Sequence, residues 1–270
     1  MNKHIAAVVQ LTSVADVAKN LARARELVGA AADRGASVVL LPENFAFMGP
    51  EADRVALAEP VPDGGPILAV LRELATNRRI HLIAGGFPER SDDPARTYNA
   101  CLFVDPRGQI VGHYRKIHLF DVAIPDGARY EESRTVLPGR EPVVATTELG
   151  TIGLSVCYDL RFPELYRELV RRGAEILVVP SAFTAYTGKD HWHPLLTARA
   201  IENQCFVLAA AQVGRHDSKR VTYGHSIILD PWGRALAEVA DGDAIALAEL
   251  DPAALERARR ELPALQHRRL

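Results

Sequence analysis

The sequence predicts an α/β fold in which two sheets pack face to face and helices cover their outer surfaces. Short apolar runs alternate with longer segments of helical periodicity along all 270 residues. Residues 35–45, GASVVLLPENF, and residues 173–183, GAEILVVPSAF, repeat Gly, Ala, four strand residues, Pro and Phe in the same order. This repeat indicates two similar helix–strand units related by an approximate internal two-fold. Chance similarity between common α/β segments is the alternative.

Strands are expected where apolar and β-branched residues cluster between turn residues. The expected strands are 4–10, 38–41, 81–85, 97–105, 110–115, 151–156, 176–179, 206–212, 226–230 and 244–250. Helices are expected where apolar residues recur at helical spacing or where proline opens a segment. The expected helices are 16–34, 66–78, 163–172, 193–204 and 253–262. Since no Ser- or Gly-rich linker interrupts the chain, we expect a single domain over 1–270, with 251–270 as a C-terminal helix and tail.

Composition narrows the classes of function. The formal net charge is −2 and the basic residues form no long stripe, so nucleic-acid binding has no electrostatic support. The three cysteines, Cys101, Cys157 and Cys205, are widely spaced and match no disulfide framework or zinc pattern, which suits the reducing cytoplasm. The apolar run near the N-terminus is too short for a membrane span and lacks a signal-peptide cleavage pattern. We therefore expect a cytoplasmic protein that contacts neither nucleic acid nor membrane.

Cys157 lies in the most informative segment, IGLSVCYDLRFPEL over residues 152–165. The pattern predicts a buried strand before the cysteine and a helix after it, so the thiol would sit on a sharp turn. Free backbone N–H groups at the start of the helix would lower the pKa of the thiol and stabilise an oxyanion. These are the properties of a cysteine nucleophile. The alternative is a buried structural thiol.

Glu43, Lys116 and Cys157 each follow an apolar strand, and ligand sites in α/β sheets gather at the carboxyl ends of strands. The three side chains suit acyl transfer. Glu43 would act as general base and acid, and Lys116 and the backbone N–H of Tyr158 would stabilise the oxyanion. Taken singly, Glu43 could be a helix N-terminal carboxylate and Lys116 a surface residue. Histidine is the commoner partner of a catalytic cysteine, and the candidates on composition alone are His118, His191, His193 and His225.

Three segments resemble the signature motifs of the nitrilase superfamily of carbon–nitrogen hydrolases. They are PENF around Glu43, YRKIHLFD around Lys116 and GLSVCYDLRFPEL around Cys157. The resemblance implies a four-layer αββα sandwich that pairs into an αββα–αββα dimer or a larger homo-oligomer. It also implies a Glu43–Lys116–Cys157 triad without a metal or other cofactor. A second active-site glutamate, which would orient Lys116 and the substrate amide, matches Glu132, with Glu131 as the less favoured choice.

Residues after two of the strands are candidates for substrate binding. Arg161 follows Cys157 by four residues, and its guanidinium suits a substrate carboxylate, as the resemblance to related amidases also implies. An internal salt bridge from Arg161 to Glu164 or Asp159 is the alternative.

The segment SAFTAYTG places three more candidates, Phe183, Thr184 and Tyr186, at the mouth of the pocket. The HWH at 191–193 is a weak metal signal because two histidines at i, i+2 come without a carboxylate partner, and no metal site is expected.

Within the superfamily, residues 201–226, 230–233 and 262–269 resemble the Nit branch. That resemblance implies hydrolysis of deaminated glutathione, an amide of 2-oxoglutarate, to 2-oxoglutarate and cysteinylglycine. An ω-amidase reaction on 2-oxoglutaramate or 2-oxosuccinamate would use the same catalytic residues and stays open. Nitrile hydrolysis and a noncatalytic scaffold on the same fold are further alternatives. The expected partners are a small-molecule amide and water.

Overall fold

The computed structural model of the chain describes residues 1–123, 129–217 and 220–269. The first sheet contains β17 (Ala244–Leu250), β1 (His4–Gln10), β2 (Val38–Leu41), β3 (His81–Arg90), β4 (Thr97–Val104) and β5 (Ile110–Arg115) in that order, with β8 (Val136–Leu137) paired to β4. The second contains β16 (Ala235–Glu238), β15 (Ile227–Leu229), β12 (Phe206–Ala209), β11 (Ile176–Val178), β10 (Gly150–Leu154) and β9 (Val144–Thr147) in that order. Two hairpins stand apart from them, β6 (Asp121–Ala123) with β7 (Arg129–Glu131), and β13 (Val213–Arg215) with β14 (Val221–Tyr223).

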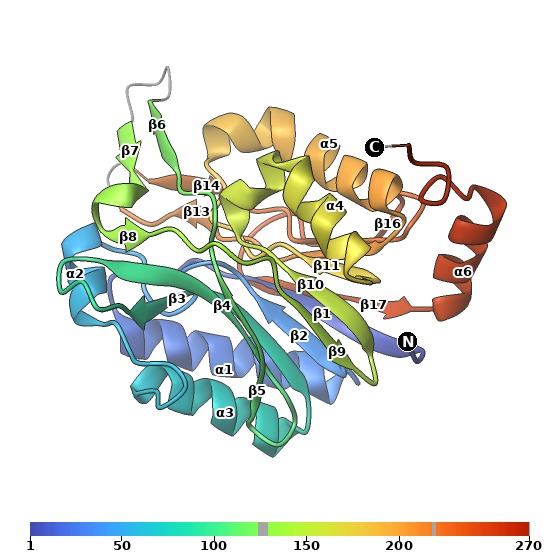
Figure 1. The fold of residues 1–270 in the computed structure, drawn as a ribbon. Helices are drawn as coiled ribbons and strands as arrows, with labels where there is room; N and C mark the ends of the chain where they lie inside the picture. The colour runs from blue at the N-terminus through green and yellow to red at the C-terminus, as the bar shows by residue number, and fades with distance from the viewer. Residues whose placement is uncertain (124–128, 218–219, 270) are drawn as a thin grey trace.

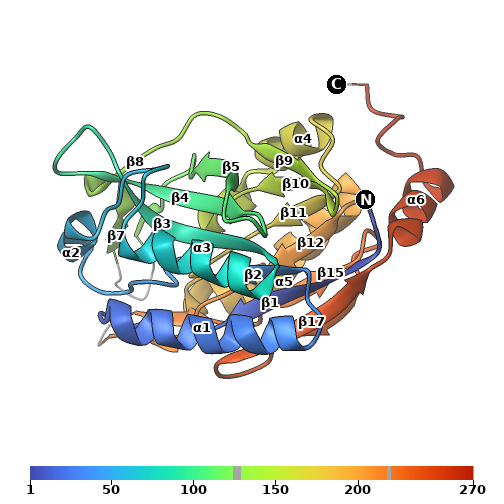
Figure 2. The same cartoon turned by 90° about the horizontal axis from the view of Figure 1, so that it is seen from below.

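The two sheets face each other between two layers of helices (Figures 1 and 2). The helices are α1 (Val17–Asp33), α2 (Glu51–Ala56), α3 (Pro66–Arg78), α4 (Pro163–Arg171), α5 (Ala185–Asn203) and α6 (Pro252–Glu261). Helices α1 and α3 cover the first sheet, and α4 and α5 cover the second. The four-layer αββα sandwich that the sequence predicts is therefore confirmed.

Strand β2 shows why the central strands are continuously apolar. Val39 and Leu41 belong to the core beneath α1 and α3, whereas Val38 and Leu40 belong to the core shared with the second sheet. A strand buried on both faces needs apolar side chains at every position, so an alternating pattern would not be stable there.

The internal repeat forms the middle strand of each sheet. β1, β2 and β3 are parallel, and so are β10, β11 and β12. β2 comes from the first copy and β11 from the second, and Gly35 and Gly173 precede them at φ 86° and 95°. The carboxyl ends of the two middle strands meet, because Ala182 after β11 donates a backbone hydrogen bond to Glu43 after β2. The repeat thus places two chain segments 139 positions apart at one point.

Helix α5 differs most from expectation, since it begins at Ala185 and not at residue 193. Pro194 lies inside it, although proline favours the first turn of a helix. Gly188 packs against the ring of Tyr223, where a Cβ would lie 2.4 Å from the tyrosine Cβ. Tertiary packing of this kind stabilises a helix segment that has little helical periodicity of its own.

Other boundaries shift as well. β3 continues to Arg90 beyond residue 85 because a register shift at Gly85 and Gly86 absorbs the glycines. β10 ends at Leu154 and β12 at Ala209, earlier than expected. Several short elements were not predicted from the sequence: α2, β6 to β9, β13, β14 and β16.

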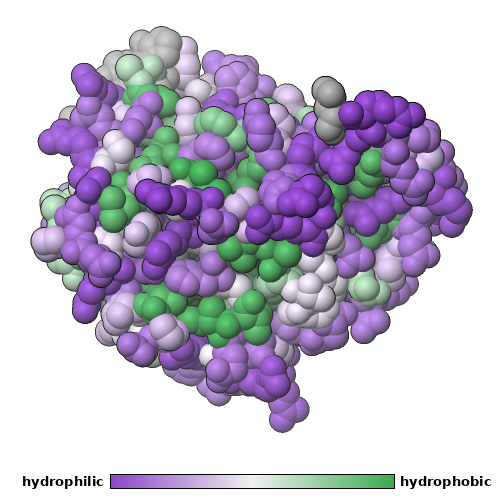
Figure 3. All heavy atoms as spheres, in the orientation of Figure 1, coloured by the Kyte–Doolittle hydropathy of each residue, from purple (hydrophilic) through white to green (hydrophobic). Residues whose placement is uncertain are grey.

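The surface is mostly hydrophilic on the face drawn in Figure 3, with apolar side chains gathered in separate patches. Among the described residues, no helix combines the length and apolar character that crossing a membrane requires.

Candidate functional site

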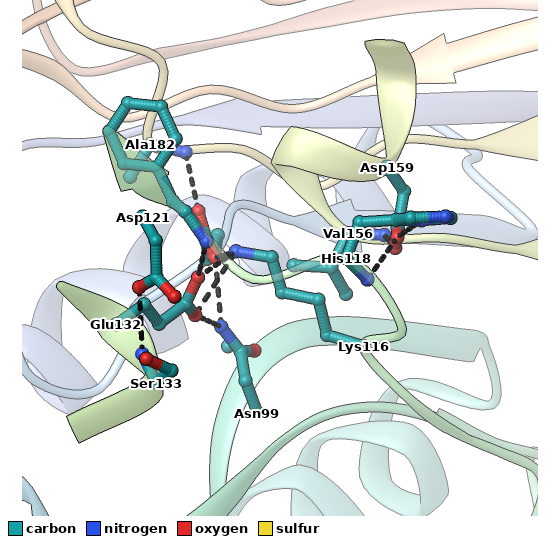
Figure 4. Close-up of polar contacts among 12 residues, drawn as sticks. Asn99, Lys116, His118, Asp121, Glu132, Ser133, Val156, Asp159 and Ala182 are labelled. Carbon is teal, nitrogen blue, oxygen red and sulfur yellow. Dashed lines mark hydrogen bonds and ion pairs between the residues drawn. The ribbon is translucent and has the colours of Figure 1, made fainter. Parts of the chain in front are cut away.

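Four residues predicted from the sequence meet at one site, and Figure 4 labels two of them, Lys116 and Glu132. Glu43 follows β2 by two residues, and Lys116 comes directly after β5. Cys157 begins the 3₁₀ helix η2 (Cys157–Arg161), and Glu132 begins the 3₁₀ helix η1 (Glu132–Arg134). All four line one cavity.

The Lys116 ammonium lies between two carboxylates. Its Nζ is 3.0 Å from Glu43 Oε1, and 2.9 Å and 3.1 Å from the two oxygens of Glu132. Lys116 and Glu43 are only 2% and 4% exposed, so these charges interact where water screens them little. Burial alone lowers the pKa of Lys116, but the charges of Glu132 and Glu43 outweigh it and raise that pKa. The lysine therefore stays charged.

Glu131 has different partners from Glu132. Its carboxylate pairs with Arg129 at 2.6 Å and with Arg134 at 3.2 Å. Glu131 lines the cavity, but Glu132 is the glutamate that contacts Lys116. The structure thus favours Glu132, the first choice of the sequence analysis.

Cys157 occupies a strained turn. Its φ of 48° lies in the left-handed region, which residues other than glycine rarely adopt. Its backbone N–H donates to Pro180 O at 2.9 Å, which ties the turn to the end of β11. The thiol lines the same cavity as the Glu43 carboxylate, and Glu43 and the backbone N–H of Ala182 both act on its pKa. The turn therefore leads into η2, and the longer helix α4 begins only at Pro163.

The expectation of a lowered thiol pKa is wrong. Burial, followed by the charge of Glu43, raises the pKa of Cys157 well above its usual range, and the opposing effect of Lys116 is smaller. Burial also acts to raise the pKa of Glu43, but Lys116 and hydrogen bonds from Asn99 and Cys157 hold it below its usual range. The site therefore holds a protonated thiol and an ionised carboxylate.

Two glycines of β3 allow close contacts at this point, Gly85 with the segment after β11 and Gly86 with the turn after β2. A Cβ on Gly85 would lie 2.3 Å from Pro180 Cγ, and a Cβ on Gly86, at φ +72°, would lie 2.0 Å from Asn44 N. Any side chain here would separate β3 from the turns that hold Glu43 and Cys157.

Three further groups position the carboxylates of Glu43 and Glu132, and none of them was among the site residues predicted from the sequence. Asn99 Nδ2 donates to Glu43 Oε1 at 2.9 Å and to Glu132 Oε1 at 3.0 Å. The backbone N–H of Ala182 donates to Glu43 at 3.0 Å, and that of Phe120 donates to Glu132 at 2.7 Å. Asn99 is a polar residue inside an otherwise buried apolar strand, which was a usable signal. The two backbone donors leave no signal in the sequence.

Asp159, fully buried, anchors η2 to the strand that carries Lys116. Its Oδ2 accepts hydrogen bonds from Tyr114 Oη at 2.7 Å and from Val156 N at 2.8 Å. Its Oδ1 contacts His118 through the ring Nδ1 at 2.7 Å and the backbone N–H at 3.1 Å. This network fixes the loop around Cys157, and it engages His118 away from the thiol.

The other histidines considered as partners of the thiol also contact different groups. His191 Nδ1 lies 3.2 Å from Arg161 Nη1. His193 and His225 both contact Glu238. The carboxylate of Glu43 is therefore the group placed to accept the thiol proton.

Arg161 lines the cavity without a carboxylate partner among the described residues, so the alternative salt bridges to Glu164 and Asp159 do not form. Its guanidinium lies over the ring of Phe183, 5.0 Å from the centroid. Phe183 and Thr184 line the cavity as expected. Tyr186 does not line it: the residue is 42% exposed and faces Lys189.

The cavity measures about 160 Å³, far more than the roughly 10–15 Å³ that one water molecule requires. It thus has room for a carbonyl group and its substituents beside the thiol. A carboxylate base and a thiol nucleophile in one cavity, with a fixed cation beside the base, suit addition to a carbonyl carbon.

The family model described as carbon–nitrogen hydrolase matches residues 5–260. A protein of Synechocystis sp. named deaminated glutathione amidase is 46% identical over 271 residues, covering 99% of both chains. A human protein of the same name is 46% identical over 272 residues, covering 98% of this chain and 82% of its own.

The solved structure of Nit3 from Saccharomyces cerevisiae, described as a member of branch 10 of the nitrilase superfamily, gives the same result for the fold. It superposes with a TM-score of 0.90 at 32% identity and covers 99% of this chain and 97% of its own. With the αββα sandwich and a family match over nearly the whole sequence, the chain belongs to the carbon–nitrogen hydrolase family, whose members hydrolyse carbon–nitrogen bonds.

Proposed function

We propose that Glu43, Lys116, Cys157 and Glu132 hydrolyse a linear amide through a thioester on Cys157. The observation that carries this proposal is the meeting of the Cys157 thiol, the ionised Glu43 carboxylate and the fixed ammonium of Lys116 in one cavity. The raised thiol pKa means that the nucleophile forms only as Glu43 removes its proton. A buried base then contributes by general catalysis, typically about 10²–10⁴-fold.

In the first half-reaction Cys157 Sγ adds to the amide carbon while its proton passes to Glu43. Glu43 then donates that proton to the amide nitrogen, the carbon–nitrogen bond breaks, and the amine leaves. In the second half-reaction Glu43 takes a proton from water, which adds to the thioester carbon. The carbon–sulfur bond breaks, the sulfur regains its proton, and the carboxylic acid is released.

Lys116 and the backbone N–H of Tyr158 would stabilise the oxyanion in both halves. Lys116 is held by Glu43 and Glu132 before substrate arrives, so little reorganisation is needed during the reaction. Glu132 positions that ammonium.

Deaminated glutathione is the substrate we propose. The name of the two relatives supports it, and so does Arg161, whose guanidinium lines the cavity without a carboxylate partner among the described residues. The acyl part of deaminated glutathione ends in the carboxylate of a 2-oxo acid. The ω-amidase substrates 2-oxoglutaramate and 2-oxosuccinamate also carry a carboxylate, so their rates decide between the two reactions.

A substrate panel tests the proposal. Deaminated glutathione, 2-oxoglutaramate, glutamine, asparagine and simple nitriles would be compared under identical conditions. We expect the highest kcat/KM for deaminated glutathione and none detectable in Cys157→Ala. Activity of Cys157→Ala on any amide contradicts the mechanism, and higher kcat/KM for 2-oxoglutaramate favours ω-amidase. A folded wild-type chain inactive on the whole panel favours a scaffold.

Arg161→Gln tests substrate recognition separately. A hydrogen bond to a charged group is worth about 1.5–3 kcal/mol, so we expect kcat/KM for 2-oxoglutaramate to fall about 10- to 100-fold. Butyramide, which lacks a carboxylate, should react at an unchanged rate. Arg171→Gln, on the exposed face of α4, is the matched control. Equal losses on both amides would contradict this role for Arg161.

We also propose that two copies of the chain pair into a dimer. Ile201 and Trp232 are 51% and 47% exposed, and Ile201 lies against Gly233, the residue after Trp232, so two exposed apolar residues come from one part of the surface. Light scattering of the wild type and of Ile201→Glu tests this pairing. A monomeric wild type would contradict it.

The chain is proposed to form one domain that works in the cytoplasm. β1 and β17, from opposite ends of the chain, pair over seven positions from His4↔Leu250 to Gln10↔Ala244, which couples the ends. All three cysteines are free and buried, which suits a reducing compartment. A single unfolding transition and cell fractionation test these two points.

A further inference from the structure

Three side chains on the α5 side of the second sheet converge away from the catalytic cavity. They are His193 on α5, His225 between β14 and β15, and Glu238 at the end of β16. Glu238 Oε1 lies 2.8 Å from His193 Nε2 and 2.9 Å from His225 Nδ1. The three potential ligand atoms all lie within 4.8 Å of one another. None of the three residues lines the catalytic cavity.

The surrounding structure fixes both imidazole rings. The ring of Tyr223 stacks on His225 with centroids 4.4 Å apart and meets His193 edge-on at 6.0 Å. Trp192 Nε1 donates to the carbonyl oxygen of His225 at 2.8 Å. His225 has a φ of 59°, a left-handed conformation in which a non-glycine residue is strained. The ring nitrogens are therefore held toward Glu238 by packing and by the backbone.

In the described part of the chain, the carboxylate of Glu238 pairs with these two histidines. Among the described residues, no lysine or arginine pairs with its carboxylate. Burial acts to raise the pKa of Glu238, but hydrogen bonds from His193 and His225 hold it below its usual range, so the carboxylate is ionised. The side chains of His193, Glu238 and His225 are 36%, 33% and 29% exposed, which leaves the cluster open to an ion from solvent.

We propose that His193 Nε2, His225 Nδ1 and a Glu238 oxygen bind a divalent transition-metal ion, with Zn²⁺ as the best match. Two imidazoles and one carboxylate form a known zinc ligand set that leaves the fourth tetrahedral position to water. Zn–N and Zn–O bonds of about 2.0–2.2 Å place neighbouring ligands roughly 3.3 Å apart. The present separations lie on both sides of that value, so small side-chain rotations admit the ion.

Binding replaces the hydrogen bonds between these groups. Each imidazole coordinates through an unprotonated nitrogen and keeps its proton on the other ring nitrogen, and a doubly protonated ring releases one proton to solvent. The ion would join α5 to β16 and to the turn before β15. In the sequence, His191 and His193 alone gave little reason to expect a metal site. In the folded chain, His193 lies beside His225 and not His191, and Glu238 provides the carboxylate.

Zinc titration of the full chain in a Cys157→Ala background tests the proposal, because this background removes the one reactive thiol of the cavity. Calorimetry should give one Zn²⁺ per chain with a Kd in the micromolar range or tighter. His193→Ala and Glu238→Gln should each weaken binding at least about 100-fold, since even outer partners of metal ligands are worth about 10–100-fold. Zn²⁺ should also raise the unfolding temperature of the parent, and not that of Glu238→Gln.

His191→Ala is the matched control, because His191 lies on the same helix two residues away and contacts Arg161 instead. It should bind Zn²⁺ as the parent does. Co²⁺ should give the visible absorption of a tetrahedral site in the parent and lose it in Glu238→Gln. Absence of binding below 100 µM added Zn²⁺, or an affinity that none of the cluster variants changes, would overturn the proposal.

Discussion

At Gly86, one added methyl group should lower kcat/KM although it contacts none of the reacting atoms. A Cβ there would lie 2.0 Å from Asn44 N and 2.9 Å from the carbonyl carbon of Glu43. Ordinary contact begins at 3.4 Å, so Gly86→Ala must displace the Glu43 turn by about 1.4 Å (3.4 − 2.0). A misplacement of about 1 Å can cost roughly 10²-fold in rate, and we expect kcat/KM to fall at least that far.

Stability should fall as well. The φ of +72° costs alanine about 1–2 kcal/mol, and overpacking costs about 1–3 kcal/mol more. At roughly 2–4 °C per kcal/mol for a chain of this size, Tm should drop by about 4–20 °C. Steady-state amide hydrolysis and thermal unfolding followed by circular dichroism measure the two effects.

Gly242→Ala separates the clash from the backbone strain. Gly242 has a φ of +68°, close to that of Gly86, but a Cβ there meets nothing within 4 Å. It should lose only the strain energy and keep full kcat/KM. If Gly86→Ala retains wild-type kcat/KM, or loses no more stability than Gly242→Ala, the close approach of β3 to Glu43 does not position the base.

Four other outcomes follow from the same structure. The pKa of Glu43 is lowered, so kcat/KM should stay level as pH falls to about the ordinary carboxyl value of 4.5 and should decline only below it. The stability that this ionised carboxylate contributes is likewise present above its unfolded-state pKa and is lost as pH falls through its folded-state pKa. A decline of kcat/KM or of stability near pH 6 would contradict these two expectations. The thiol pKa is raised, so iodoacetamide should label Cys157 slowly, with no inflection between pH 6 and 8. Asn99→Ala removes one donor from two buried carboxylates, which should cost about 1–3 kcal/mol in unfolding free energy and lower kcat more than it raises KM; wild-type kinetics would refute that positioning role. Glu59 accepts from Ile67 N and Leu68 N at the start of α3, so Glu59→Gln should lower Tm through the loss of helix capping, with unchanged kcat/KM as the control measurement.

Much of the fold could be predicted because its signals are local. The apolar runs of β1, β2 and β11 are almost entirely buried, which requires continuous hydrophobicity. The repeat indicated two related units, and they form the middle of the two sheets. The start of α5 could not be predicted in this way, since contact with Tyr223 stabilises its first turns.

The same distinction between local and long-range signals applies to the residues of the site. Glu43, Lys116 and Cys157 were recognisable because each follows a strand, and the carboxyl ends of strands gather in space. The backbone donors of Ala182 and Phe120 were not, because a backbone N–H is the same in every residue and only the fold directs it at a carboxylate. The thiol pKa was predicted in the wrong direction because complete burial and the adjacent charge of Glu43 are properties of packing.

The type of fold and the identity of the reactive groups follow from the amino-acid order alone, because the spacing of hydrophobic residues and the chemistry of each side chain are local properties. Only the tertiary structure decided their protonation, the glutamate that meets Lys116, and the meeting of His193, His225 and Glu238. These depend on distances of about 3 Å between atoms that the chain separates by tens of residues, and such distances exist only once the two sheets have packed.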